Sequence, residues 1–161
     1  MVDVMSSAVR SALMSRIRAK NTKPERIVRK LLWARGFRFR LHAKGLAGKP
    51  DLVLPKWRAV VFINGCFWHR HWDCSNFRLP KTRTAFWDAK LLANRQRDLV
   101  VTDRLHRTGW RVVVVWECAI RLDPEEATNQ LATWLSEGKA GAEIRAYEGS
   151  VTTQHFDGAM R

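Results

Sequence analysis

The stretch Ala59-Val60-Val61-Phe62-Ile63-Asn64-Gly65-Cys66 decides the fold. Its first five residues form a continuous apolar run, which is typical of a central strand buried on both faces. A second run of this kind, residues 110–116, follows a predicted long helix over residues 84–107, where apolar residues recur three or four apart. Strands that alternate with helices in this way predict an α/β fold with a mixed β-sheet flanked by helices.

The segments upstream of the central strand carry their own start and stop signals. Thr22 is a helix cap, Pro24 suits the first turn, and Glu25 occupies the capping-box position, so a helix begins there and ends near Gly36. The other elements that the sequence predicts are a basic helix over residues 6–19, strands over residues 37–41 and 51–54, and a helix over residues 124–135.

Length and composition predict one main domain. The chain has 161 residues with 46% hydrophobic content and eight tryptophans, which is enough for a real core. We expect a basic helical arm over residues 1–20, a single folded domain over residues 21–147 and a flexible polar tail over residues 148–161.

The charge of the chain is large and unevenly distributed. Of the net charge of +14, most lies in residues 1–58, which hold 15 Lys and Arg against 3 Asp and Glu. Such a basic half indicates a protein that neutralises nucleic-acid phosphates. A membrane surface is the alternative, but it needs a broad apolar helix face that this segment lacks. Without a secretion signal or an apolar run of roughly 20 residues, we expect a cytoplasmic protein.

The nine residues Cys66-Phe67-Trp68-His69-Arg70-His71-Trp72-Asp73-Cys74 crowd thiols, imidazoles and aromatic rings together. The third cysteine, Cys118, lies far downstream, and three cysteines cannot pair completely as disulfides. Cys66, His71, Cys74 and Cys118 could therefore form a tetrahedral Cys3His zinc site, which leaves His69 unassigned. The alternative is that the cysteines are small buried core residues.

A second candidate site lies where two predicted strands form a hairpin. Asp51 begins one strand and Ile63 ends the next, so the Asp51 carboxylate and the Ile63 backbone carbonyl could face one cleft. Such sparse oxygen ligands suit Mg²⁺, which keeps water and phosphate in its other positions. His69 could relay a proton and Glu25 could accept a hydrogen bond from metal-bound water. The alternatives are a turn role for Asp51, capping alone for Glu25 and an idle surface His69.

Five motifs occur in order along the chain: MSRIRAKNTKPE at residues 14–25, GKPD at 48–51, VFINGCFWH at 61–69, TRTAFW at 82–87 and GWRVVVVWEC at 109–118. Together they resemble the very-short-patch repair endonucleases over roughly residues 7 to 135. The resemblance implies a fold related to type II restriction endonucleases. It also implies a Mg²⁺-dependent nick in one DNA strand, 5′ to the thymine of a T·G mismatch that arises from deamination of 5-methylcytosine.

The resemblance also implies roles for individual residues. Asp51 and the carbonyl of Ile63 would bind Mg²⁺, His69 would contact the activated water and Glu25 would support it. Zn²⁺ would be held by Cys66, His71, Cys74 and Cys118. Asn64 stands where the best-known family pattern has a histidine, so either His69 would act alone or Asn64 would merely orient water through hydrogen bonds.

The DNA contacts that the resemblance implies come from an aromatic wedge and a helix. Phe67, Trp68 and Trp87 would insert beside the mismatch, although Trp87 alone would otherwise be read as a core residue. The further contacts would come from Lys90, Asn94 and Arg97. The partners implied are duplex DNA with a T·G mismatch, mismatch-repair proteins and a repair polymerase, and we expect a monomer.

Two other functions are compatible with these residues. A restriction-type endonuclease on the same scaffold would cut matched duplexes as well. A zinc-stabilised DNA-binding module would bind DNA without cutting it.

Overall fold

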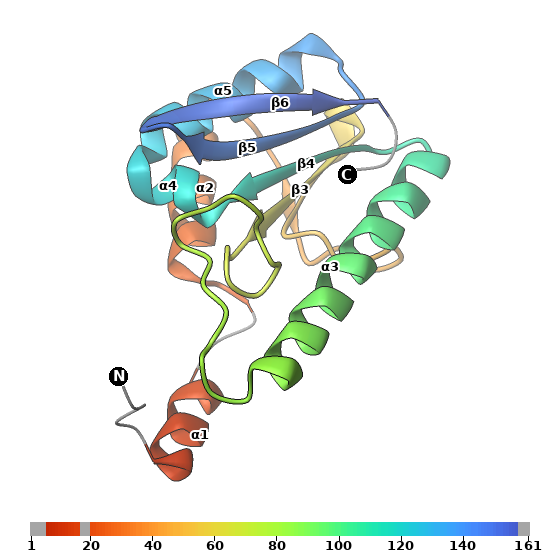
Figure 1. Cartoon of the computed structure of the whole chain (residues 1–161). Helices are drawn as coiled ribbons and strands as arrows, with labels where there is room; N and C mark the ends of the chain where they lie inside the picture. The colour runs from red at the N-terminus through yellow and green to blue at the C-terminus, as the bar shows by residue number, and fades with distance from the viewer. Residues whose placement is uncertain (1–5, 17–19, 158–161) are drawn as a thin grey trace.

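The computed structural model of this protein describes residues 6–16 and 20–157 (Figure 1). Its centre is a six-stranded sheet whose strands pair in chain order. The strands are β1 (Arg40–Leu41), β2 (Leu52–Leu54), β3 (Ala59–Asn64), β4 (Arg111–Trp116), β5 (Gly141–Tyr147) and β6 (Ser150–Phe156). The pairs β3–β4 and β4–β5 are parallel and the other three pairs are antiparallel. The predicted mixed sheet is therefore confirmed.

Helices lie on both faces of this sheet, as Figure 1 shows. They are α1 (Ser7–Ser15), α2 (Lys23–Ala34), α3 (Thr84–Arg107), α4 (Glu117–Leu122) and α5 (Pro124–Glu137), with the short 3-10 helix η1 at Pro55–Trp57. The side chains of α2, α4 and α5 share one buried cluster on one face, and α3 packs on the opposite face. None of the helices in the described residues is long and apolar enough to cross a membrane.

The two central strands are mainly apolar because both of their faces are covered. Val61 and Val113 point into the cluster formed with α2, α4 and α5, whereas Val60 and Val112 pack with Leu105 of α3. All four valines are 0% exposed. Complete burial of one valine side chain contributes about 1.5 kcal/mol or more, so these strands hold the two helical layers together.

The carboxyl-terminal part differs from the expected flexible tail. Residues 150–156 form β6, which pairs with β5 along its whole length from Tyr147 opposite Ser150 to Gly141 opposite Phe156. The two-residue turn between them, Glu148-Gly149, has positive φ at both positions (47° and 77°). That geometry matches the right-handed twist of a hairpin. The expectation of a tail starting at residue 148 is wrong because β6, a mostly polar edge strand, lacks the apolar run that marks a buried strand.

Other boundaries shifted by smaller amounts. The predicted helix over residues 84–107 is α3 unchanged, but the strand predicted over residues 37–41 is reduced to β1. The basic amino-terminal helix is α1 and ends at Ser15; residues 17–19 of that prediction lie outside the described residues. The six-residue α4 was not predicted, and it carries Cys118.

Candidate active site and metal centre

The ends of β3 and β4 bring two distant cysteines together. The strands are parallel, and Asn64 pairs with Trp116 at their carboxyl ends. Cys66 and Cys118 each follow these paired residues by two positions. Because the carboxyl ends of parallel strands meet at one edge of a sheet, the fold places both thiols side by side.

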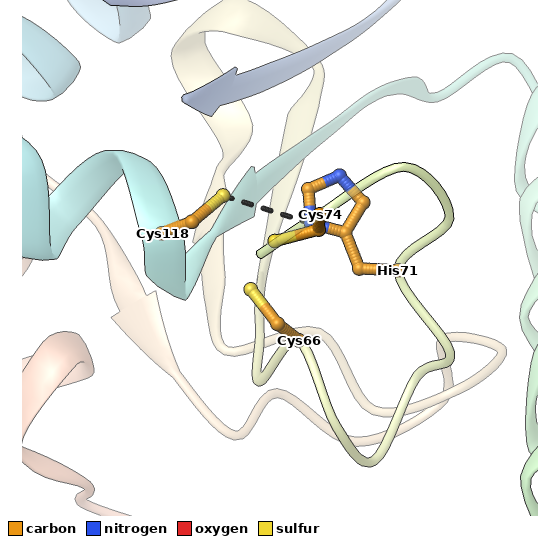
Figure 2. Close-up of side chains that lie close together, drawn as sticks. All are labelled: Cys66, His71, Cys74 and Cys118. Atoms are coloured by element: carbon orange, nitrogen blue, oxygen red, sulfur yellow. Dashed lines mark hydrogen bonds between the residues drawn. The ribbon is translucent and has the colours of Figure 1, made fainter. Parts of the chain in front are cut away.

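His71 and Cys74 complete a group of four side chains from the loop after β3 and from α4 (Figure 2). We call Cys66, His71, Cys74 and Cys118 the metal cluster. Their ligand atoms all lie within 4.8 Å of one another, and the Cys118 Sγ is 3.6 Å from the His71 Nδ1. Cys66, His71 and Cys118 are buried and Cys74 is partly buried. The four residues that the sequence singled out are thus together, in an arrangement that could hold one metal ion.

The surroundings of the metal cluster orient its ligands. The His71 ring stacks on Trp116 at 3.9 Å between centroids with an interplanar angle of 3°. The backbone N–H of Ala146 donates to the Cys118 Sγ at 3.4 Å. A hydrogen bond from the Cys66 thiol and the neighbouring His71 lower the pKa of the Cys118 thiol, whereas the same contact with Cys118 raises the pKa of Cys66. The lowered pKa favours a thiolate at Cys118, and a thiolate is the form that binds metal.

Asp51 lies directly before β2, where the hairpin register sets it next to the end of β3. Its backbone N–H donates to the Val61 carbonyl at 3.0 Å, and its Oδ2 accepts a hydrogen bond from the Ile63 N–H at 2.7 Å. Burial raises the pKa of the Asp51 carboxyl to about 6, although the Ile63 N–H lowers it. The structure brings Asp51 and Ile63 together as the hairpin argument predicts. A ligand role for the Ile63 carbonyl stays a prediction.

A glycine allows the loop before Asp51 to take its path. Gly48 has φ of +70°, a conformation that side chains rarely adopt. A Cβ at this position would also collide with Val101 of α3. Any larger residue at position 48 would therefore push the loop away from α3 and shift Asp51.

Glu25 is the third residue of α2 and is 3% exposed. Its carboxylate accepts hydrogen bonds from the Thr22 hydroxyl at 2.9 Å, from the Asn21 N–H at 2.9 Å and from Arg29 at 2.7 Å. The capping interpretation is confirmed. The charge of Glu25 also raises the pKa of Asp51, so the two carboxylates are electrostatic neighbours.

His69 has a partner that the sequence did not reveal. The His69 Nδ1 and the Asp98 Oδ2 are 2.7 Å apart, with side chains 31% and 22% exposed. If Nδ1 carries the proton and donates it to this carboxylate, Nε2 is left free to accept one. The signal was present in the helix pattern, since Asp98 occupies a position in the otherwise mainly apolar stripe of α3. A carboxylate on a buried stripe indicates a partner across the fold.

Asn64, at the end of β3, is 5% exposed. It lines a small cavity together with Asp98 and Thr102 of α3. Its side chain therefore lies on the α3 side of the sheet, near the acidic partner of His69.

The aromatic side chains of the same loop form a compact group with α3. Trp68 lies 5.1 Å from Phe67 and 6.1 Å from Trp87 between ring centroids. Phe67 and Trp68 are partly exposed, but Trp87 is 9% exposed and so supports the other rings. Phe86, which the sequence reasoning missed, is 46% exposed and 5.5 Å from Trp87. Phe86 directly precedes Trp87 in the sequence, and this neighbour could have indicated that Phe86 belongs to the same group of rings.

The three polar residues predicted on α3 have different surroundings. The Lys90 Nζ lies 5.9 Å from the centre of the Trp68 ring. The Asn94 Nδ2 donates to the Trp68 carbonyl at 3.1 Å, and Arg97 donates to the Asn94 Oδ1 at 3.3 Å. Asn94 therefore holds the aromatic loop against α3, while Lys90 and Arg97 are exposed.

Comparison with known proteins agrees with this arrangement. A sequence model of the family described as DNA mismatch endonuclease Vsr matches residues 2–76. The Escherichia coli DNA mismatch endonuclease Vsr is 41% identical over 148 residues, covering 89% of this chain and 94% of that protein. The type II nicking enzyme V.XorIIP of Xanthomonas oryzae pv. oryzae is 49% identical over 120 residues, covering 74% and 88%.

A third relative extends the comparison. The type II nicking enzyme V.NmeAIP of Neisseria meningitidis is 45% identical over 121 residues, covering 75% of this chain and 86% of that enzyme. These relatives align over most of their own length, and their names agree with the very-short-patch repair motifs. The chain therefore belongs to the Vsr family of DNA mismatch endonucleases and is a DNA endonuclease.

Proposed function

We propose that this endonuclease nicks one strand of duplex DNA 5′ to the thymine of a T·G mismatch, by Mg²⁺-dependent hydrolysis. The observation that carries the proposal is the His69–Asp98 pair, 2.7 Å apart, within electrostatic reach of the Asp51 carboxyl. A carboxylate that can hold a cation and an oriented imidazole that can accept a proton are the parts that phosphodiester hydrolysis needs.

Asp51 is suited to hold Mg²⁺. Its pKa of about 6 leaves it ionised at neutral pH, although burial makes that charge costly. A cation beside it would offset that cost, and a Mg²⁺ site needs only one or two protein carboxylates. The Ile63 carbonyl is the second proposed ligand. When bound, Mg²⁺ supplies the positive charge that stabilises the phosphate in the transition state.

His69 is the proposed general base. With Nδ1–H bonded to Asp98, the imidazole can accept the proton of the attacking water at Nε2. Asp98 is a positioning residue in this scheme, because it orients the ring and favours the imidazolium that forms. Glu25 stabilises the start of α2 and would contribute a hydrogen bond to water near Asp51.

The metal cluster is proposed to hold a structural Zn²⁺. Three sulfurs and one imidazole fill a tetrahedron, which leaves no open position for substrate. The four ligand atoms already lie within 4.8 Å of one another, so one ion could reach all of them. Such an ion would fasten the loop of residues 66–74 to α4. His69, Phe67 and Trp68 lie on that loop between the ligands.

The partly exposed rings of Phe67 and Trp68 are the proposed wedge at the mismatch. Base–aromatic stacking contributes about 1–3 kcal/mol per base, and a mispair resists unstacking less than a matched pair. Trp87 and Phe86 would support these rings. Lys90, Arg97 and the basic side chains of α2 would contact the phosphates, with Asn94 holding the loop in place.

The deciding experiment compares nicking of a T·G duplex with nicking of its C·G counterpart, with and without Mg²⁺. We expect cleavage of the T·G substrate alone, only with Mg²⁺, and lost in Asp51→Ala. Asp103→Ala is the matched control, because Asp103 is another carboxylate of α3 and pairs with Arg107 on the surface.

Three outcomes would contradict the proposal. Equal cutting of both duplexes would favour a restriction-type enzyme, and binding without cutting would favour a DNA-binding module. Full nicking by Asp51→Ala would exclude Asp51 from the catalytic centre.

The proposed setting is the bacterial cytosol, where the enzyme would act as a monomer. The nick would be passed to mismatch-repair proteins and a repair polymerase. Sedimentation of the protein with and without duplex DNA would test the monomer.

A further inference from the structure

A small cavity lies behind the His69–Asp98 pair, between the sheet and α3. It measures about 10 Å³, and its walls are Phe62, Asn64, Asp98, Val101, Thr102 and Val114. A volume of about 10–15 Å³ is what a single water molecule needs. Asn64, Asp98 and Thr102 are the polar wall residues, so a molecule in the cavity would form its hydrogen bonds with these three side chains.

Two of the three polar side chains at this cavity, those of Asn64 and Thr102, are buried. Asn64 is 5% and Thr102 is 2% exposed. Within the described part of the chain, neither side chain forms a hydrogen bond with another protein group. Asp98 uses one carboxylate oxygen for His69. A buried polar group that lacks a hydrogen bond costs about 1–3 kcal/mol, so the Asn64 and Thr102 side chains favour a partner that they share with the second carboxylate oxygen of Asp98.

We propose that one ordered water occupies this cavity and bridges Asn64, Asp98 and Thr102. Buried waters form about three hydrogen bonds, which is the number of polar side chains that line the space. The bridge would hold the Asp98 carboxylate in the orientation that His69 needs. Asn64 and Thr102 are then positioning residues that act through Asp98, and this catalytic consequence rests on the function proposed above.

This assignment gives Asn64 a defined task. An amide can donate and accept hydrogen bonds at once, so it can satisfy a water whose other partners are a carboxylate and a hydroxyl. Asn64 would then support the chemistry from behind His69 without touching DNA.

The direct test is a crystal structure of the protein at a resolution of about 1.5 Å. We expect one density peak within hydrogen-bond distance of Asn64, Asp98 and Thr102. An empty cavity would overturn the proposal, as would a direct hydrogen bond between Asn64 and Asp98 that closes the space.

The functional test removes one hydroxyl without changing the side-chain volume. Thr102→Val should lower the single-turnover nicking rate constant about 3- to 10-fold and leave the Kd for T·G DNA unchanged. Thr102→Ser keeps the hydroxyl and should restore the rate. Thr128→Val is the matched control, because Thr128 is also a buried helical threonine but lies in α5 on the other face of the sheet. A wild-type rate in Thr102→Val would overturn the proposal.

A double-mutant cycle tests whether the two residues act through one water. Asn64→Leu and Thr102→Val should be non-additive, so that the double variant is little slower than the slower single variant. Fully additive losses would contradict a shared water. Thermal unfolding and metal content of each variant identify any that fail to fold, and the crystal structure of the wild type decides the matter without them.

The two proposals fail in distinguishable ways. If wild-type protein nicks no T·G duplex but the water is present, the function is wrong and the water site stands. If wild-type protein nicks and the cavity is empty, only the water is wrong.

Discussion

The metal cluster and the Asp51 carboxyl lie at the same end of β3, but the chain surrounds them in opposite ways. Four side chains converge in the metal cluster, and second contacts such as the Trp116 ring and the Ala146 N–H fix their orientation. Asp51 has one N–H donor at its carboxylate, a negative neighbour in Glu25 and a pKa raised to about 6. The metal cluster supplies all four ligands of a tetrahedral site. The Asp51 carboxylate, in contrast, is buried beside another carboxylate, and the structure shows a single N–H donor to it.

If the metal cluster and Asp51 each hold a metal as proposed, this difference separates a structural from a catalytic use of the ion. A structural site gains folding free energy from every ligand, so a full set of ligands is best. A catalytic site must keep positions open for water and phosphate. Stability is therefore expected to depend on the metal cluster, and activity on Asp51 and the His69–Asp98 pair. Substitutions in the two regions should therefore affect stability and activity separately.

The largest expected effect is the loss of the metal cluster. Cys118→Ser removes a thiolate ligand that is 5% exposed, so we expect loss of bound zinc and of most of the folded protein. Elemental analysis and circular dichroism against temperature measure both. Ser75→Ala, beside Cys74 on the exposed loop, is the control that should keep both. A cooperatively folded, zinc-free Cys118→Ser protein would remove the structural role.

The next effect concerns the orientation of His69. Asp98→Asn keeps the shape of the side chain but weakens its hold on the Nδ1 proton, so the nicking rate constant should fall about 10- to 100-fold. Zinc content and thermal stability should stay near wild type. Asp103→Asn, one turn further along α3 and exposed, should nick normally. If Asp98→Asn lost zinc as well, the two regions would not be separable.

Asp51 should destabilise the Mg²⁺-free protein at neutral pH. A carboxyl whose pKa is raised from 3.8 to about 6 by folding holds its proton more tightly when folded, so its contribution to stability is present below pH 4 and lost as pH rises through 6. Asp51→Asn should therefore raise the free energy of unfolding at pH 7.5 by on the order of 2 kcal/mol while abolishing nicking.

Urea unfolding of both proteins at pH 4 and pH 7.5, with zinc retained and Mg²⁺ omitted, measures this effect. The advantage of Asp51→Asn should grow with pH and shrink when Mg²⁺ is added to the wild type. An advantage that is equal at both pH values would contradict the raised pKa.

The smallest expected effect is on mismatch recognition. Trp68→Ala should reduce the preference for T·G over C·G duplexes by about 1 kcal/mol in binding, because it removes one stacking surface from the loop. Fluorescence anisotropy with both duplexes measures the preference. Trp33→Ala is the control, since Trp33 is 53% exposed on α2 and its ring contacts Phe39 and Arg38. An unchanged preference for T·G over C·G duplexes in Trp68→Ala would mean that the Trp68 ring serves packing and not mismatch recognition.

Patterns that depend on neighbours in the chain could be predicted, and this includes the residues of the metal cluster. The valine runs predicted β3 and β4, and the spacing of Cys66, His71 and Cys74 predicted a common site. The mostly polar edge strand β6 could not be predicted in the same way, because it forms by pairing with β5 along its whole length. The Glu148-Gly149 turn also lacks the Asn-Gly or Asp-Gly pair that marks most two-residue hairpins.

The amino-acid sequence by itself determined which chemistry is available: three thiols with a histidine, a carboxylate at a strand start, and aromatic rings beside His69. Only the tertiary structure decided that Asp98, 29 positions after His69, is its partner, and that Asn64 faces that partner from behind. The physical reason is that α3 crosses the open face of the sheet. The helical repeat determines which residues share one face of α3. Only the packing of α3 on the sheet determines which side chains that face contacts.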